Sequence, residues 1–144
     1  MNVETILRNK GNRVATIRPE ATVGDAVEML NRERIGALVV SGDGAGVDGI
    51  LSERDIVMAL GDHGADLMSR PVSAIMTRNV ITCEPNETVG ELMAEMTNRR
   101  IRHFPVMADG RLCGIVSIGD LVKNRLDEIE YEAHSMRSFI AGAA

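Results

Sequence analysis

The sequence predicts a mixed α/β fold (α+β) of two β-α-β-β-α repeats, packed face to face with pseudo-two-fold symmetry. The first observation is an internal repeat that covers most of the 144 residues. The second is that each copy contains short aliphatic runs bounded by Gly, Pro and Asp, as strands and their turns require. The third is the composition, 44% hydrophobic but only 2% aromatic, which suits strands covered by aliphatic helices.

The repeat is clearest between residues 14–25 (VATIRPEATVGD) and 80–91 (VITCEPNETVGE). Matching positions are 66 residues apart up to Val40 and Val106, and 65 apart after the loop at 41–47, which explains the change. The lead-in segments 3–7 and 72–76 also match. The main pairs are Pro19 and Pro85, Thr22 and Thr88, Gly24 and Gly90, Gly49 and Gly114, Ser52 and Ser117, and Asp55 and Asp120.

In the first repeat, a strand over 14–17 ends before a proline, which cannot donate to a strand ladder. A helix follows, with Thr22 as N-cap and Asp25 three residues on, as in a capping box. Strands are then expected at 37–40 and 47–51, joined by a Gly/Asp turn, and a second helix starts after Ser52.

The second repeat has the same order of elements. We expect a strand at 80–83, a helix capped by Thr88, strands at 103–107 and 112–116, and a helix after Ser117. Residues 61–71 link the halves. The expected division is repeat 1 with its lead-in helix and link at 1–66, repeat 2 at 67–126, and a helical extension at 127–144. Neither repeat alone covers both faces of so small a sheet, so we expect them to pack together.

The last helix carries apolar residues at alternating steps of four and three, as in a heptad pattern. Two interpretations stay open, an amphipathic helix docked on its own domain and a dimer contact. The residues are Val122, Leu126, Ile129, Ala133, Met136 and Ile140.

Charge and composition restrict the function. A net charge of −5 makes nucleic acid an unlikely partner, because a general binder needs a basic surface. No apolar run approaches the roughly 18 residues that cross a bilayer, and residues 1–10 lack a signal-peptide core, so we expect no membrane association and a cytoplasmic protein. Cys83 and Cys113 lack C-x-x-C spacing and read as two reduced, buried thiols rather than a redox pair.

Two copies of a Gly-x-x-Ser-x-x-Asp motif occur at strand-to-helix junctions, at 49–55 and 114–120. The Asp can accept both hydroxyls of a ribose, while the Ser hydroxyl and the helix N-terminus can hold a phosphate. The same residues also suit plain N-capping, which needs no ligand. The basic strand at 102–106 (RHFPV) is the feature that favours binding.

These motifs and their order resemble the tandem cystathionine-β-synthase (CBS) domain pair, or Bateman module, over about residues 3–126. The resemblance implies a non-catalytic sensor that binds an adenosine nucleotide between the repeats. AMP is the first expectation, with ATP, ADP, NAD(H) and S-adenosylmethionine within the family's range. It also implies a homodimer, as a disc of four repeats, and an effector protein that the sequence does not name.

The resemblance further implies two sites, each joining the motif of one repeat to strands of the other. One site has Ser52, Arg54 and Asp55 with Ile81, Arg102, His103 and Pro105. The other has Ser117 and Asp120 with Asn12, Ala15, Gly36 and Ala37. Because Gly36 and Ala37 match Arg102 and His103, we expect a charged phosphate to bind better beside Asp55. Arg99 and Arg100 are expected only to complement the dipole at the end of their helix.

Two other function classes compete with a sensor. An enzyme is disfavoured because His63, His103 and His134 are scattered without nucleophile or metal spacing, and no P-loop or G-x-G-x-x-G is present. A protein-interaction subunit that uses the pair as a scaffold without nucleotide is the alternative to the sensor.

Overall fold

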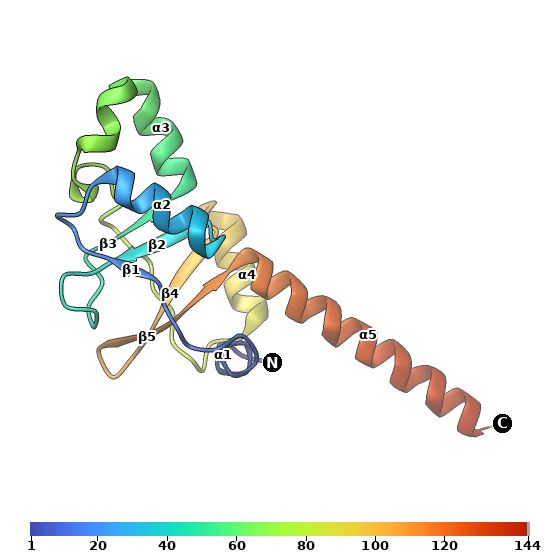
Figure 1. Cartoon of the computed structure of the whole chain (residues 1–144). Coiled ribbons are helices and arrows are strands. Elements are labelled where there is room, and N and C mark those ends of the chain that lie inside the picture. The colour runs from blue at the N-terminus through green and yellow to red at the C-terminus, as the bar shows by residue number, and fades with distance from the viewer. Residues whose placement is uncertain (144) are drawn as a thin grey trace.

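The computed structural model describes residues 1–143, so Ala144, at the end of the expected extension, lies outside the described residues (Figure 1). The α-helices are α1 (Val3–Lys10), α2 (Val23–Glu33), α3 (Glu53–His63), α4 (Val89–Arg99) and α5 (Ile118–Ala143). The strands are β1 (Thr16–Ile17), β2 (Ala37–Val40), β3 (Gly49–Ser52), β4 (His103–Ala108) and β5 (Arg111–Ser117). Two short 3-10 helices follow α3, Gly64–Ser69 in the link between the halves and Val72–Ala74 in the lead-in of the second repeat.

The strands form two small sheets, and the mixed α+β class is confirmed. In the first sheet β1 runs parallel to β2, and β2 runs antiparallel to β3. In the second sheet β4 pairs antiparallel with β5. Helices α2 and α3 lie over the first sheet, whereas α1 and α4 lie beside the second (Figure 1). The elements of the two halves therefore follow the repeat that the sequence contains.

The helix starts predicted from the motifs are confirmed. Thr22, Ser52 and Thr88 each begin a helix with a complete capping box, in which the side chain accepts from the N3 amide and the N3 carboxylate accepts from the cap amide. Such boxes satisfy two backbone donors that a helix otherwise leaves unpaired. Helices α2 and α4 are followed by the C-cap residues Arg34 and Arg100, both in the left-handed conformation with φ of 54° and 56°.

The strand expected at 80–83 is wrong as a regular strand, because only Cys83 forms a bridge, with Val106. Proline explains the difference. In the first half, the Val39 amide donates to the Ala15 carbonyl at 3.3 Å. The matching position on β4 is Pro105, which has no N–H and cannot donate to the strand beside it.

The two lead-in segments are exchanged between the halves. Val3 and Ile6 of α1 are buried in the core of the second half with Phe104, whereas Val72 and Met76 are buried in the core of the first half. The sequence expectation assigns the lead-in at its start to repeat 1, but its apolar side chains complete the core of repeat 2.

The exchange of the lead-in segments explains why both Gly-x-x-Ser-x-x-Asp motifs begin with glycine. A Cβ at Gly49 would lie 2.7 Å from the Met76 sulfur and 2.8 Å from the Thr77 carbonyl oxygen. A Cβ at Gly114 would lie 2.6 Å from a methyl of Leu7. Each glycine therefore gives a lead-in segment room to lie against the strand.

Helix α5 leaves the body of the molecule and projects from it (Figure 1). Leu121 and Asn124, in its first two turns, are buried, but Leu126, Met136 and Ile140 are more than half exposed. The interpretation of a helix docked on its own domain is therefore wrong for the part beyond Arg125. The apolar stripe is open in the single chain.

Candidate ligand-binding site between the repeats

Two cavities open between the repeats, one of about 860 Å³ and one of about 350 Å³. They are called the larger and the smaller cavity below. Gly36, His103 and Ser117 line both, so the two cavities meet near the starts of β2 and β4. Volumes of ~300–1,000 Å³ are those of typical small-molecule sites.

The larger cavity brings together six of the seven residues expected beside Asp55. It combines the start of α3 with the segment before α4 and with the start of β4, so both repeats contribute. The expected residues that line it are Ser52, Arg54, Asp55, Ile81, Arg102 and His103. Pro105 is buried and does not line it.

Asp55 is held by its capping box and by the lead-in segment of the second repeat. Its Oδ2 accepts from the Ser52 amide at 2.9 Å and from the Ser52 hydroxyl at 3.0 Å. Its Oδ1 accepts from the Thr77 hydroxyl at 3.1 Å. Ser52 and Asp55 therefore do form an N-cap, as one of the two interpretations predicted. The same bonds hold the Asp55 carboxylate at the cavity wall, where hydroxyl groups of a ligand can compete with Thr77.

More cationic side chains line the larger cavity than the basic strand at 102–106 predicted. Arg54, Arg100 and Arg102 all line it, and Arg54 and Arg102 are exposed. Arg100 was expected only to complement a helix dipole, but its position just beyond α4 places it at the cavity. Arg99 instead pairs with Glu95 on the same helix. Three guanidinium groups at one cavity suit an anionic group such as a phosphate.

His103 lies half-buried where the two cavities meet. Burial lowers its pKa below the ordinary value, and the positive charges of Lys10 and Arg102 act in the same direction. The carboxylates of Asp120 and Glu53 oppose this without reversing it. The ring is therefore neutral near pH 7 and can both donate and accept a hydrogen bond.

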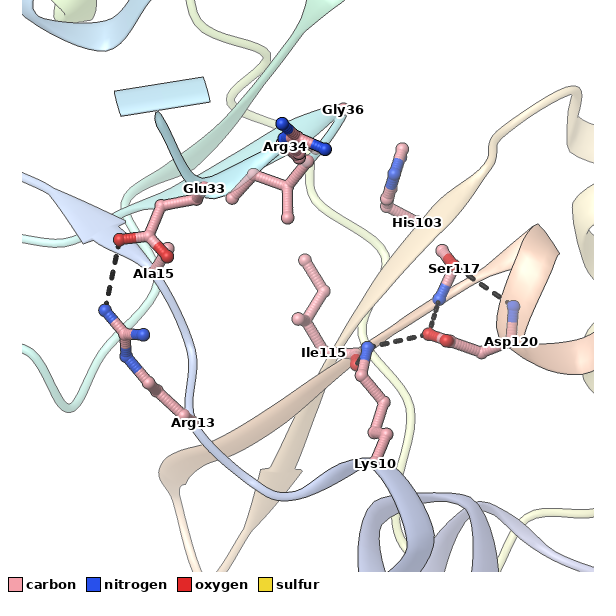
Figure 2. Close-up of a pocket in the computed structure, with 12 residues that line it drawn as sticks. Lys10, Arg13, Ala15, Glu33, Arg34, Gly36, His103, Ile115, Ser117 and Asp120 are labelled. Atoms are coloured by element: carbon pink, nitrogen blue, oxygen red, sulfur yellow. Dashed lines mark hydrogen bonds and ion pairs between the residues drawn. The ribbon is translucent and has the colours of Figure 1, made fainter. Parts of the chain in front are cut away.

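The smaller cavity is closed on one side by an ion pair that sequence reasoning missed (Figure 2). Lys10, at the end of α1, donates to Asp120 Oδ2 at 2.7 Å and to the Ile115 carbonyl at 3.0 Å. The Ser117 amide donates to the same Oδ2 at 2.9 Å. Burial acts to raise the pKa of Asp120, but the bonds from Lys10 and Ser117 outweigh it and hold that pKa below its usual range.

Five of the six residues expected at the site of Ser117 and Asp120 line the smaller cavity, namely Ala15, Gly36, Ala37, Ser117 and Asp120. Asn12 is exposed and does not line it. Arg13 and Arg34 do, and Arg13 pairs with Glu33 at 3.2 Å (Figure 2). The expected preference of phosphate for the other site depended on the absence of cations from the smaller cavity. That absence holds only for positions 36 and 37.

Proline makes the matching segments 14–17 and 80–83 chemically different. The Ala15 carbonyl beside the smaller cavity accepts the ladder bond from Val39. The matching Ile81, which lines the larger cavity, faces Pro105 and receives no such bond. The Ile81 carbonyl at the larger cavity thus accepts no ladder bond from β4 and is available to other hydrogen-bond donors.

Within residues 1–143, no helix is long and apolar enough to span a bilayer. In the same part of the chain, His, Cys, Asp and Glu form no group of three or more that could hold a metal ion.

The chain is similar in sequence to two proteins described as containing CBS domains. The mitochondrial CBS domain-containing protein CBSX3 of Arabidopsis thaliana is 38% identical over 125 residues, which are 84% of this chain and 61% of that protein. CBS domain-containing protein YhcV of Bacillus subtilis is 31% identical over 114 residues, which are 79% of this chain and 80% of that protein. The chain thus spans less than two thirds of the plant protein and most of the bacterial one.

Solved structures agree with the fold. A CBS-domain-containing protein from Agrobacterium tumefaciens superposes with a TM-score of 0.83 and 44% identity, over 86% of this chain and 92% of that chain. The CBS domain pair of protein MJ0100, solved with 5′-methylthioadenosine and S-adenosyl-L-methionine, gives a TM-score of 0.76 at 27% identity, over 85% and 98%.

The sequence profile of the CBS domain matches the chain twice, over residues 6–62 and 72–127. These two segments contain both Ser/Asp motifs and most of the residues that line the cavities. The chain belongs to the CBS domain family and is a tandem CBS pair.

Proposed function

We propose that the chain is a non-catalytic regulatory module that binds an adenosine nucleotide in the larger cavity and signals by a change of conformation or assembly. The observation that carries the proposal is the larger cavity, where the fixed carboxylate of Asp55 lies with Arg54, Arg100 and Arg102. A carboxylate for sugar hydroxyls and guanidinium groups for phosphate match the two polar parts of a nucleotide. The adenosine ligands of MJ0100 support the same class.

Each part of the ligand has a proposed position. Asp55 accepts the two ribose hydroxyls and exchanges its bond from Thr77 for them. Arg102, His103 and Arg100 receive the phosphate. The aliphatic wall around Ile81 and its free carbonyl hold the adenine, whose exocyclic amine is a donor.

AMP is the first candidate because one phosphate suffices for the cations of the larger cavity. ADP, ATP, NAD(H) and S-adenosylmethionine are the other candidates within the class. The smaller cavity is proposed as a second site of the same kind but of smaller volume, with Ser117 and Asp120 in the roles of Ser52 and Asp55.

The rest of the proposal concerns the whole chain. Residues 1–66 and 67–126 act as the two repeats and 127–144 as a helical extension. We propose a cytoplasmic homodimer that passes the signal to an effector protein. Ligand shifts such an assembly only by its different affinity for two states.

A thermal-unfolding screen against these nucleotides tests the proposal. A ligand at about one hundred times its Kd should stabilise the fold by ~2.7 kcal/mol. Asp55→Asn and Arg102→Ala should remove the stabilisation. Arg111→Ala, on β5 and outside both cavities, is the control and should keep it.

Stabilisation that survives Asp55→Asn but is lost in Asp120→Asn would move the site to the smaller cavity. No stabilisation by any nucleotide, with the protein folded, would contradict the proposal and favour an interaction subunit that uses the pair as a scaffold.

A further inference from the structure

The exposed face of α5 beyond Arg125 carries a continuous apolar stripe. Leu126, Ile129, Met136 and Ile140 are between 46% and 62% exposed, and with Ala133 they alternate steps of three and four residues. Single exposed apolar residues are ordinary on protein surfaces. A stripe that keeps this spacing along a projecting helix is instead the pattern of a coiled-coil seam.

The body of the molecule does not cover this stripe. Helix α5 contacts α1, α4 and β5, and its buried residues, Leu121 and Asn124, lie in its first two turns. From Arg125 to Gly142, every residue except Glu128 is exposed in the described structure. Figure 1 shows the helix running away from both sheets. At ~1.5 Å per residue, the 18 residues from 126 to 143 extend roughly 27 Å, so a partner can lie along them without meeting the sheets.

The charges beside the stripe identify the partner and its direction. With Leu126, Ala133 and Ile140 at heptad position a, the charged residues at the flanking positions are Arg125 and Glu132 at g, and Lys123, Glu130 and Arg137 at e. In a parallel, in-register pair, each g residue faces the e residue five positions on in the other helix. Arg125 then faces the partner's Glu130, and Glu132 faces the partner's Arg137. Both contacts join opposite charges, and the two-fold axis repeats them.

The opposite orientation is disfavoured by the same residues. In a fully overlapped antiparallel pair, e faces e and g faces g. Glu130 would meet the partner's Glu130, Glu132 the partner's Glu132, and Lys123 the partner's Arg137. All three contacts join like charges. An antiparallel pair shifted by one heptad relieves this repulsion, but it leaves one end of the stripe uncovered, either Met136 and Ile140 or Val122 and Leu126, depending on the direction of the shift.

We infer that α5 pairs with the α5 of a second copy of this chain as a parallel, in-register, two-stranded coiled coil. The seam is formed by Val122, Leu126, Ile129, Ala133, Met136 and Ile140. Within one chain Arg125 pairs with Glu128 at 3.4 Å, with about half of the Arg side chain exposed. Exposed pairs of this kind contribute little, so Arg125 can exchange Glu128 for the partner's Glu130 at small cost. The pairing uses no residue of either cavity and requires no nucleotide.

Disulfide trapping tests the orientation directly. The two copies of residue 133 face each other across the seam only in the parallel, in-register pair. Mild oxidation of Ala133→Cys should therefore give a covalent dimer on a non-reducing gel. Tyr131→Cys, on the outer face of the same helix and 73% exposed, is the matched control and should give little. Equal or absent cross-linking of the two variants would overturn the proposal.

Sedimentation equilibrium then tests whether this seam holds the dimer. The wild type should be dimeric at micromolar concentration, and Ile129→Asp should weaken the dimer at least tenfold, whereas Tyr131→Asp should not. Glu130→Arg should weaken it, and the double variant Arg125→Glu with Glu130→Arg should restore it by exchanging the charges. A monomeric wild type, or a dimer that Ile129→Asp leaves intact, would overturn the proposal. Nucleotide stabilisation of the Ile129→Asp monomer keeps this result separate from the proposed ligand site.

Discussion

The imidazole of His103 forms part of the wall of both cavities, and its protonation is coupled to whatever binds beside it. Its pKa is lowered, first by burial and then by Lys10 and Arg102. A bound phosphate adds a negative charge near the ring and raises that pKa, so binding takes up a proton. The affinity of a phosphate ligand therefore carries a pH dependence with a defined sign.

We expect a nucleotide to bind more tightly as the pH falls from 8 to 6, because a larger fraction of complexes then contains protonated His103. Isothermal titration calorimetry at pH 6, 7 and 8 measures the trend. His103→Gln should flatten it while leaving binding at pH 8 nearly unchanged. If the affinity of His103→Gln depended on pH as strongly as that of the wild type, the proton taken up on binding would belong to another group.

Residues at the cavities could be predicted from the sequence where they lie on the matched motifs. Arg100 and its match 66 positions earlier, Arg34, were both missed as cavity residues, because a basic residue at the end of a helix also suits the helix dipole. Lys10 could not be found in this way. It reaches Asp120 because α1 packs against the other repeat, and no local pattern contains that long-range contact.

At the scale of the elements, Pro105 in β4 prevents the neighbouring segment 80–83 from forming a regular strand. The position of β4 was predicted from its aliphatic run, but the loss of the strand at 80–83 was not. The residues at 80–83 suit a strand as well as those at 14–17 do. The cause lies about 20 residues further along the chain, at Pro105, whose missing N–H removes a ladder bond from Ile81.

Pro105→Val supplies the missing donor. We expect the free energy of unfolding to rise by ~0.5–1.5 kcal/mol as the Ile81 carbonyl gains a ladder bond. Nucleotide affinity should fall, since that acceptor is then occupied. Urea unfolding and calorimetry measure the two effects, with Pro85→Ala as a control that should not alter affinity. Unchanged affinity in Pro105→Val would remove the Ile81 carbonyl from the ligand site.

Two glycines in equivalent strands should respond differently to alanine. The Cβ at Gly49 meets a backbone oxygen, that of Thr77, at 2.8 Å, whereas at Gly114 it meets only the flexible end of Leu7. We expect Gly49→Ala to cost ~1–3 kcal/mol and Gly114→Ala less. Gly61, in α3 with open space around it, provides the control, since Gly61→Ala should stabilise by up to ~1 kcal/mol. Thermal unfolding of the three variants gives the order.

At the scale of the whole molecule, each half depends on a segment that the sequence places with the other. The repeat predicted the two-fold arrangement, but the two lead-ins are similar in sequence, so the sequence alone did not decide which core each enters. Val3 and Val72 are both fully buried. Val3 lies against the core that contains Phe104, and Val72 against the core that contains Leu51.

Val3→Ala and Val72→Ala form a matched pair that tests the exchange. Each removes two methyl groups from a core and should cost ~1–3 kcal/mol. Amide hydrogen exchange should show the loss of protection in β4 and β5 for Val3→Ala, and in β2 and β3 for Val72→Ala. Loss of protection in the half nearer in sequence would contradict the exchange.

The exchanged lead-ins also bear on how such a chain could have arisen. A single repeat of this design carries a lead-in that its own core does not receive. It can close only by giving that segment to a second molecule and accepting one in return, as in domain swapping. Joining two such copies end to end keeps every contact and turns a reciprocal exchange between molecules into packing within one chain. In this view, the 3-10 turns at Gly64–Ser69 mark the junction at which an ancestral swapped dimer became a single polypeptide.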